Sequence, residues 1–296
     1  MHMAVSRVQT SLDVCPISAA LGAEIRGVDL SRPLNSSLRE ALYDAFLEYG
    51  LLVFPDQQID DDQHVAFARH WGRLQVHVLN QYQHEKNPEI FVLTNLTPEG
   101  SPKGENPDPG AAIWHTDGSW SRERGLATML YSMAVPKSGG DTLFCNMYRA
   151  YDALPAMLKS ELESRRAVHD LNYSRQLSGA KKQMTREQRR KAPPVDHEII
   201  RVHPDTGRKT LYLGEHASHI EGMPVDRARA LIAELNSIAT QPGNVYTHRW
   251  QVGQMVIWDN RCLMHKATGF DFMNDIRVVR RTTTVGERLP AASQRR

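Results

Sequence analysis

The chain has 296 residues, of which 41% are hydrophobic and 24% are charged, and its formal net charge is +2. This is an ordinary globular composition with room for a sizeable core, and so small a charge excess does not indicate nucleic acid as a partner. The three cysteines Cys15, Cys145 and Cys262 lack metal-ligand spacing and predict reduced thiols. No apolar run is long enough to cross a membrane and no secretory signal is visible, so we expect a cytoplasmic protein that binds no membrane.

The N-terminal third of the chain predicts mainly packing elements. One or two short strands are expected within 14–30. Apolar residues at helical spacing predict helices over 38–49 and 60–71. The all-apolar run 51–54 predicts a buried strand, and 89–94 predicts another. We assign no chemistry to these elements.

Two loops flank the second of these strands. Residues 73–88 are irregular and contain His77. They form either a polar surface loop or a loop on the substrate side, because they precede the strand that leads to the first chemical motif. Residues 97–110 are rich in proline and glycine, and long loops in compact domains are often functional or mobile.

The first chemical motif is Trp114-His115-Thr116-Asp117. On a strand, His115 and Asp117 would point to the same face and could hold one metal ion. Alone the pattern is weak, because an isolated histidine is more often structural. It gains weight from His265, far along the chain, since two histidines and one carboxylate form the facial triad of non-haem Fe(II) oxygenases.

The middle of the chain alternates strands, turns and helices. Strands are expected over 126–135 and 143–146, joined by the glycine-containing turn 136–142. A helix is expected over 147–165, with Pro155 breaking or restarting it.

Residues 174–194 are strongly basic, with seven lysines and arginines against Glu187. A nucleic-acid patch is one interpretation, but no aromatic residue is interleaved for base stacking. A solvated, mobile insertion is favoured. Its position between two core segments would also suit a lid over an active site.

The second half of the chain predicts further short strands and one helix. We expect a hairpin of 195–204 with 209–213, a helix over 224–240, a hairpin of 244–251 with 254–258 across Val252-Gly253, and a last strand over 276–285. Many short strands with helices outside them predict a mainly β protein with flanking helices and a jelly-roll core. Because no repeat or boundary is visible, we predict one domain, 1–296.

Two arginines on the last strand suggest that carboxylates bind beside the metal. Arg277 and Arg281 share parity and should face one side, whereas Arg280 should face the other. A guanidinium gives a carboxylate two parallel hydrogen bonds. The alternative for Arg277 is an ordinary charge at the edge of a strand.

Four motifs in this order resemble the TauD/TfdA-like Fe(II)/2-oxoglutarate-dependent dioxygenases, over about Pro16 to Gly286. The motifs are Trp114-His-Thr-Asp117, Gly139-Gly-Asp-Thr142, Trp258-Asp-Asn-Arg261 with His265, and Arg277-x-x-x-Arg281. The resemblance implies a double-stranded β-helix core with Fe(II), the cosubstrate 2-oxoglutarate and O2. It implies these roles: iron ligands His115, Asp117 and His265; 2-oxoglutarate carboxylate site Thr142 and Arg277; substrate acid site Arg281.

Other histidines are candidates for the substrate pocket. Spacings similar to those of the phenoxyacetate enzymes favour His216 as a contact to the substrate acid, with a supporting or surface role as the alternative. His77 is a weaker candidate. For His203 and His248 a structural role is favoured.

The resemblance implies hydroxylation of a small anionic organic substrate. We expect an aryloxyalkanoate-type carboxylic acid, with ether cleavage after hydroxylation, and a homo-oligomer. The presence of Asp117 favours hydroxylation, because related halogenases lack this carboxylate. A dioxygenase of taurine, alkylsulfonates or alkyl sulfates is the main alternative. Outside the family, the alternative hypotheses for the same residues are a zinc hydrolase and a non-catalytic jelly-roll binding protein.

Overall fold

A large antiparallel sheet runs through the computed structural model, which describes residues 12–289. Its strands follow the order β1-β2-β3-β14-β6-β16-β4, and β5 pairs with β16. Only β2 and β3 run parallel within it. The strand bounds are β1 Asp13–Pro16, β2 Ala23–Arg26, β3 Leu51–Phe54, β4 Arg73–Leu74, β5 Phe91–Thr94, β6 Gly125–Ala134, β14 Met255–Asp259 and β16 Val278–Val285.

A three-stranded sheet packs against the large one. It has the order β13-β7-β15, with β13 Val245–His248, β7 Thr142–Asn146 and β15 Leu263–Ala267. The predicted hairpin of 244–251 with 254–258 is therefore wrong. β13 pairs with β7 in this sheet, whereas β14 pairs with β3 and β6 in the large sheet. Gly253, at φ 79°, lies in the turn that carries the chain from one sheet to the other.

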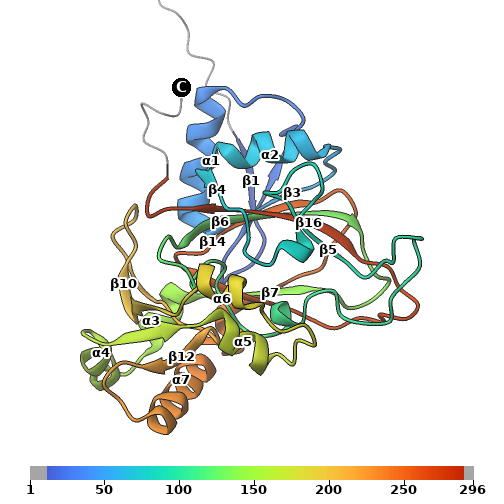
Figure 1. The fold of residues 1–296 in the computed structure, drawn as a ribbon. Helices are drawn as coiled ribbons and strands as arrows, with labels where there is room; N and C mark the ends of the chain where they lie inside the picture. Colours follow the sequence, from blue (N-terminus) through green and yellow to red (C-terminus); the bar gives the residue numbers. More distant parts are fainter. Residues whose placement is uncertain (1–11, 290–296) are drawn as a thin grey trace, which may run out of the picture.

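The all-apolar strands are buried because both of their faces are covered. On one face, Leu52 and Ile257 pack in a cluster beneath the helices α1 (Ser36–Tyr49) and α2 (Asp61–Arg69). On the other face, Val53 and Trp258 pack in a second cluster that includes Phe144 of the smaller sheet. Figure 1 shows α1 and α2 above the large sheet and β7 below it.

A third cluster lies beside the two sheets. It is built from α3 (Met147–Ala153), α4 (Ala156–Leu162) and α7 (Val225–Ala239), together with a three-stranded sheet and a hairpin. The sheet is β12-β8-β9, with β8 Arg166–His169, β9 Val195–Glu198 and β12 Ala217–Ile220; the hairpin is β10 Ile200–Val202 with β11 Lys209–Leu211. Pro155 separates α3 from α4, as expected. The single strand expected over 195–204 is two strands: β9 belongs to the sheet β12-β8-β9, and β10 belongs to the hairpin with β11.

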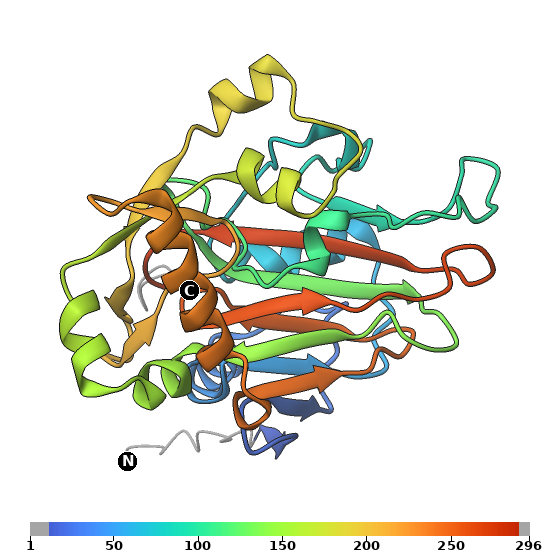
Figure 2. The same ribbon diagram turned by 90° about the horizontal axis from the view of Figure 1, so that it is seen from below.

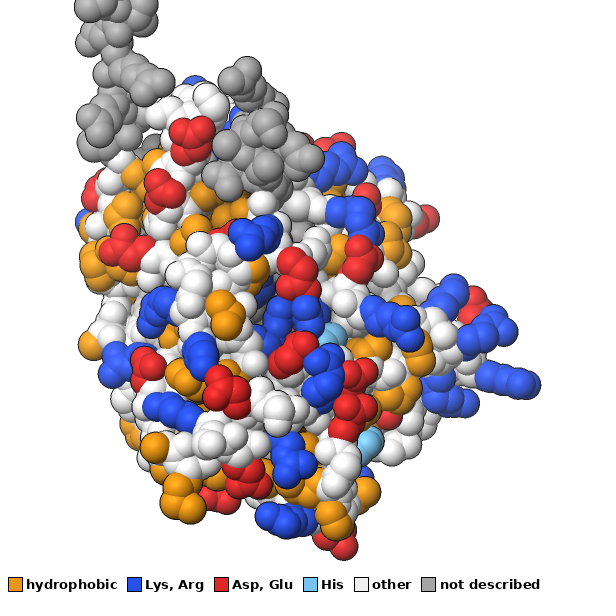
Figure 3. Space-filling view, turned by 90° about the vertical axis from the view of Figure 1, so that its left-hand side faces the viewer, with side chains coloured by type: hydrophobic (Ala, Val, Ile, Leu, Met, Phe, Trp, Pro, Cys, Tyr) orange, Lys and Arg blue, Asp and Glu red, His pale blue; other side chains and the backbone are white. Residues whose placement is uncertain are grey.

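The basic segment 174–194 contains the end of α5 (Leu171–Leu177) and all of α6 (Arg186–Lys191). Met184 is buried in the second cluster, and the Gln188 amide donates to Asn80 Oδ1 at 3.0 Å. Figure 2 shows these two helices along one side of the sheets, next to the loops that precede β6. In Figure 3, Lys and Arg side chains gather on the projection at the right, whereas both charges are interspersed over the rest of that face.

The result is a mixed α/β structure with several sheets, in which helices flank the strands that carry the candidate site. Among residues 12–289, no helix has the length and apolar character needed to cross a membrane.

Candidate metal site and pocket

His115 and His265 meet through their backbones. The His115 N–H donates to the His265 carbonyl at 3.0 Å, and the His265 N–H donates to the His115 carbonyl at 2.8 Å. This isolated bridge places the two imidazole rings side by side, with centroids 4.2 Å apart. The expectation that His115 and Asp117 lie on one strand is wrong, because the bridge involves His115 alone and Asp117 begins the following turn.

Asp117 completes a three-residue cluster from this turn. Its Oδ1 lies 3.8 Å from His115 Nε2, and its Oδ2 lies 3.7 Å from His265 Nε2. One ligand atom from each residue falls within 4.8 Å of the others. The turn requires glycine at 118, where φ is 71° and an added Cβ would lie 2.5 Å from the Gly125 amide nitrogen.

The surroundings of the cluster favour metal-binding forms of its side chains. His115 Nδ1 lies 2.7 Å from the Ile113 carbonyl, to which it donates its proton, so Nε2 presents a lone pair. Burial, followed by the nearby His115, holds the pKa of His265 well below 6.5, which favours its neutral, metal-binding form. Burial of Asp117 disfavours its charge, but Arg281 and the two histidines outweigh this effect and lower its pKa.

Arg277 is a buried cation without an acidic partner among residues 12–289. It is 6% exposed and its Nε has no hydrogen-bond partner. Burial lowers its pKa to about 10, and its backbone N–H is held by Asn95 Oδ1 at 2.9 Å. Because burying an unpaired charge is costly, this guanidinium fits a site that receives an anion.

Gly140, two residues before Thr142, lies next to the side chain of Arg277. An added Cβ at Gly140 would lie 3.5 Å from Arg277 Cδ, and φ there is 67°. Thr142 is buried at the start of β7, and its Oγ1 accepts a hydrogen bond from Trp250 Nε1 at 3.0 Å. Its hydroxyl proton is then free to donate to an incoming carboxylate. Trp250 was not identified from the sequence.

Arg281 lies against the metal cluster itself. Its Nη1 donates to Asp117 Oδ1 at 3.1 Å, and its guanidinium carbon lies 4.3 Å from the centroid of the Phe91 ring. Arg280 faces the other side of the sheet and pairs with Asp61 of α2. The expectation that Arg280 and Arg281 face opposite ways is therefore confirmed.

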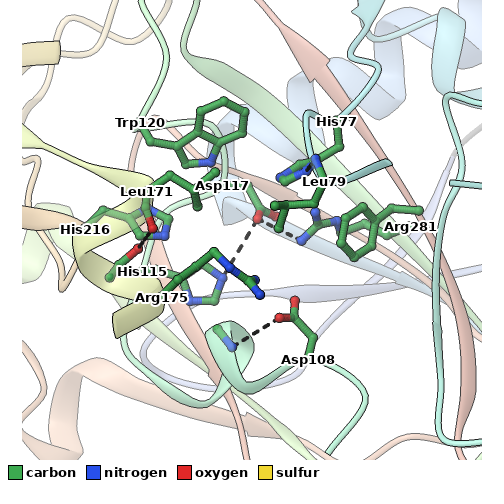
Figure 4. A pocket seen from close by; sticks show the side chains of 13 residues that line it. His77, Leu79, Asp108, His115, Asp117, Trp120, Leu171, Arg175, His216 and Arg281 are labelled. Carbon is green, nitrogen blue, oxygen red and sulfur yellow. Dashed lines mark hydrogen bonds and ion pairs between the residues drawn. The ribbon is translucent and has the colours of Figure 1, made fainter. Parts of the chain in front are cut away.

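One pocket brings five of the predicted site residues together: His77, His115, Asp117, His216 and Arg281. His216 Nδ1 lies 2.9 Å from Ser119 Oγ, and its ring centroid is 5.4 Å from that of His115. The ring of His77 packs between Phe91 and Trp120. Figure 4 shows these side chains converging on the His115–Asp117 pair. Thr142, Arg277 and His265 do not line this pocket.

The same pocket contains residues that sequence reasoning missed. Trp120 follows Asp117 by three positions and forms part of the wall, with Phe91 nearby. Arg175 was grouped with the solvated charges of 174–194, but it is only 3% exposed and lines the pocket. Arg175 differs from its basic neighbours because it is buried, and no local pattern in the sequence indicates that burial.

His203 and His248 are held in structural networks. His203 Nε2 lies 3.1 Å from Asp259 Oδ2, and the same carboxylate is paired with the guanidinium of Arg261. His248 Nε2 lies 3.1 Å from Gln254 Oε1. His203, Asp259 and Cys262 also bring ligand atoms within 4.8 Å of one another, and Arg261 is a further partner of this carboxylate.

Comparisons with known proteins agree with this arrangement. The family model described as "Taurine catabolism dioxygenase TauD, TfdA family" matches residues 13–283. The chain is 38% identical, over 280 residues, to an alpha-ketoglutarate-dependent 2,4-dichlorophenoxyacetate dioxygenase of Cupriavidus pinatubonensis, covering 92% of this chain and 97% of the relative. A protein of the same description from a Burkholderia species is 41% identical over 249 residues, covering 81% and 82%.

The solved structures include a similar fold. The crystal structure of AAD-2 in complex with Mn(II) and N-oxalylglycine superposes with a TM-score of 0.86 at 32% sequence identity. The match covers 95% of this chain and 100% of that one.

Proposed function

The chain belongs to the taurine catabolism dioxygenase TauD, TfdA family, and from this premise we propose that it hydroxylates a small organic acid of the aryloxyalkanoate type. It is an alpha-ketoglutarate-dependent (2-oxoglutarate-dependent) dioxygenase, hence an oxidoreductase, with His115, Asp117 and His265 as its metal site. The family uses Fe(II). The observation that carries the finer proposal is that His115 and Asp117 of the triad share a pocket with the buried Arg281, while a second buried arginine, Arg277, has no acidic partner among residues 12–289.

The residues around the triad divide into two sites. Thr142 and Arg277 would hold the distal carboxylate of 2-oxoglutarate, because a buried guanidinium and a free hydroxyl proton together supply three hydrogen bonds. Fe(II) and 2-oxoglutarate, when bound, supply the oxidising power that replaces a C–H bond by C–OH, with O2 consumed and succinate and carbon dioxide released. The fold would therefore hold the cosubstrate at Thr142 and Arg277, and the substrate in the pocket that His115 and Asp117 line.

The substrate side is the pocket of Figure 4. Arg281, His77 and His216 would orient the acid group, while Phe91 and Trp120 exclude water and contact an apolar body. Arg281 also fixes Asp117 through its 3.1 Å hydrogen bond, so it connects substrate binding to the geometry of the metal ligand.

Hydroxylation of an aryloxyacetate would lead to ether cleavage without a further catalyst. The new hydroxyl group stands on the carbon that bears the ether oxygen, which makes the product a hemiacetal. The bond between this carbon and the aryloxy oxygen breaks as the hydroxyl proton moves to that oxygen, and the remaining hydroxyl oxygen becomes the aldehyde oxygen. The balanced products are a phenol and glyoxylate. The two relatives named above are described as acting on 2,4-dichlorophenoxyacetate, which supports this substrate class.

The same residues bear on the alternative functions. A zinc hydrolase has no use for a buried, unpaired Arg277, a non-catalytic jelly-roll binding protein would consume no oxygen, and neither agrees with family membership. Taurine, alkylsulfonates and alkyl sulfates remain the second substrate class, because a guanidinium binds sulfonate as well as carboxylate.

A succinate-release screen tests the proposal. Purified protein loaded anaerobically with Fe(II) and 2-oxoglutarate is exposed to oxygen with phenoxyacetate, 2,4-dichlorophenoxyacetate, taurine or an alkyl sulfate. We expect the aryloxyacetates to give the most succinate, in step with phenol release. Coupled turnover with taurine or the alkyl sulfate alone would replace the carboxylate proposal by the second class.

Residues 174–194 would form a lid over this pocket. Lys181 and Lys182 are exposed and offer trypsin a cleavage site, and Lys181 pairs with Glu105 of the opposite loop at 2.9 Å. We expect slower tryptic cleavage there when Mn(II), 2-oxoglutarate and phenoxyacetate are all present than with Mn(II) alone. Cleavage at the same rate in both mixtures would mark the segment as a passive surface loop.

The core, the domain and the assembly of the protein are also proposals. We infer a double-stranded β-helix, or jelly-roll, core formed by the large sheet and β13-β7-β15, because these sheets enclose the second cluster and the triad lies at their edge. We further infer one dioxygenase domain spanning 1–296, and a cytoplasmic homo-oligomer.

A further inference from the structure

Arg175 occupies an unusual position for a residue in a basic surface segment. Its side chain is 3% exposed, and Figure 4 shows it reaching from α5 into the metal pocket, beside Asp108. Its Nη2 donates to the Lys182 carbonyl at 2.8 Å, and its guanidinium interacts with the Tyr82 hydroxyl. Its Nε is buried without a hydrogen-bond partner, and no ion pair of the described residues includes it.

Arg175 also stands where two cavities meet. The metal pocket offers about 30 Å³, while a neighbouring cavity of about 660 Å³ is lined by the loop 103–109 and residues 179–182. Arg175 lines both of them. The smaller space holds about one water molecule, so an organic substrate reaches the metal only when a wall moves. Arg175 belongs to the wall that separates the two cavities.

The outer cavity has the charge that an acid would need. Its lining contains four basic residues, Lys103, Arg175, Lys181 and Lys182. The single acidic residue of the lining, Glu105, is already paired with Lys181. A concave surface of one sign raises the local concentration of ligands of the opposite sign. An anion that enters through this cavity meets Arg175 before it meets the metal.

We propose that Arg175 is a substrate-binding residue that holds the acid group of the primary substrate and thereby draws residues 174–194 over the occupied pocket. This inference rests on the proposed function, since it requires an anionic substrate. Arg281 is already engaged with Asp117, whereas the hydrogen-bond partners of Arg175 within residues 12–289 are the neutral Lys182 carbonyl and Tyr82 hydroxyl. The acid group thus supplies the charge that the buried Arg175 lacks, and the two arginines form the substrate site together.

The test is a calorimetric titration of the full-length protein loaded with Mn(II) and 2-oxoglutarate, without oxygen. Phenoxyacetate is the acidic probe, and phenoxyacetamide is its neutral counterpart. Arg175→Gln should weaken phenoxyacetate binding about thirtyfold or more, because a charge-assisted contact is lost, and should leave phenoxyacetamide binding unchanged. Arg175→Lys should recover part of the loss, since it keeps the charge but not the planar fork.

Two variants serve as matched controls. Arg190→Gln removes the same charge from an exposed position of the same segment and should bind both probes as the wild type does. Asp108→Asn removes a negative charge from the pocket while keeping the Oδ1 atom that accepts the Gly110 N–H at 3.1 Å, and should strengthen phenoxyacetate binding. In Arg175→Gln, phenoxyacetate should no longer slow tryptic cleavage at Lys181 and Lys182.

The outcomes separate this inference from the proposed function. Equal weakening of both probes in Arg175→Gln would reduce Arg175 to a structural residue, and unchanged phenoxyacetate binding would remove it from the substrate site. If wild-type protein binds no phenoxyacetate, the aryloxyalkanoate proposal fails, and taurine and octyl sulfate replace it in the same titration. If Arg175→Gln selectively loses affinity for those anions, the role of Arg175 in substrate binding is still supported. If Arg175→Gln binds them as the wild type does, or if the wild type binds none of them, that role is overturned.

Discussion

His115→Ala and His265→Ala should each abolish substrate turnover and release the metal. The two rings lie 4.2 Å apart on one backbone bridge, and each supplies one of the three ligand atoms of the cluster, so each substitution leaves only two. Loss of an outer-shell partner typically costs about 10–100-fold in metal affinity, and loss of a ligand should cost more. Fe(II) affinity, measured anaerobically by competition with a chelator, and succinate release are the two readouts.

The control for these variants is His219→Ala. His219 is partly exposed and contacts Ser218, outside the metal cluster, so iron affinity and turnover should stay near the wild-type values. Circular dichroism and thermal unfolding of the metal-free proteins establish that each variant folds. Wild-type-like iron binding by both ligand variants, with the fold intact, would refute the triad.

Arg277→Met should raise the apparent Michaelis constant for 2-oxoglutarate by about thirtyfold or more, because losing a charge-assisted bidentate contact costs on the order of 2–5 kcal/mol. Methionine keeps much of the side-chain volume and removes an unpaired buried charge. The thermal midpoint of the cosubstrate-free protein should therefore not fall. This second readout distinguishes loss of a binding group from loss of folding, and steady-state kinetics with 2-oxoglutarate varied provides the first.

Arg281→Ala should produce a different kinetic pattern. The Michaelis constant for 2-oxoglutarate should stay near its original value, since Arg281 lies about 13 Å from Arg277 along the strand backbone. Substrate binding should weaken, and 2-oxoglutarate should be consumed without matching product. Because Arg281 also donates to Asp117, iron affinity should fall moderately as well. Equal effects of both substitutions on both Michaelis constants would contradict the division of roles, and the reverse pattern would exchange them.

Local features of the sequence were sufficient for most secondary structure. The apolar run of β3 indicated a buried strand, and Pro155 indicated the break between α3 and α4. These features depend on side-chain periodicity and on backbone restrictions of a few neighbouring residues. The pairing of strands depends instead on which surfaces need covering. β14 lies between β3 and β6, where both of its faces are buried, although β13 is its neighbour in the chain.

The candidate site shows the same division. The residue types and order of the triad, and the common parity of Arg277 and Arg281, were readable from the sequence because metal ligation and strand alternation leave regular patterns. Only the tertiary structure decided that His115 joins His265 through a backbone bridge and that Arg281 reaches Asp117. It alone distinguished Arg175 from its solvated basic neighbours. The burial of a charge is set by residues distant in sequence that pack around it, and no local pattern records their presence.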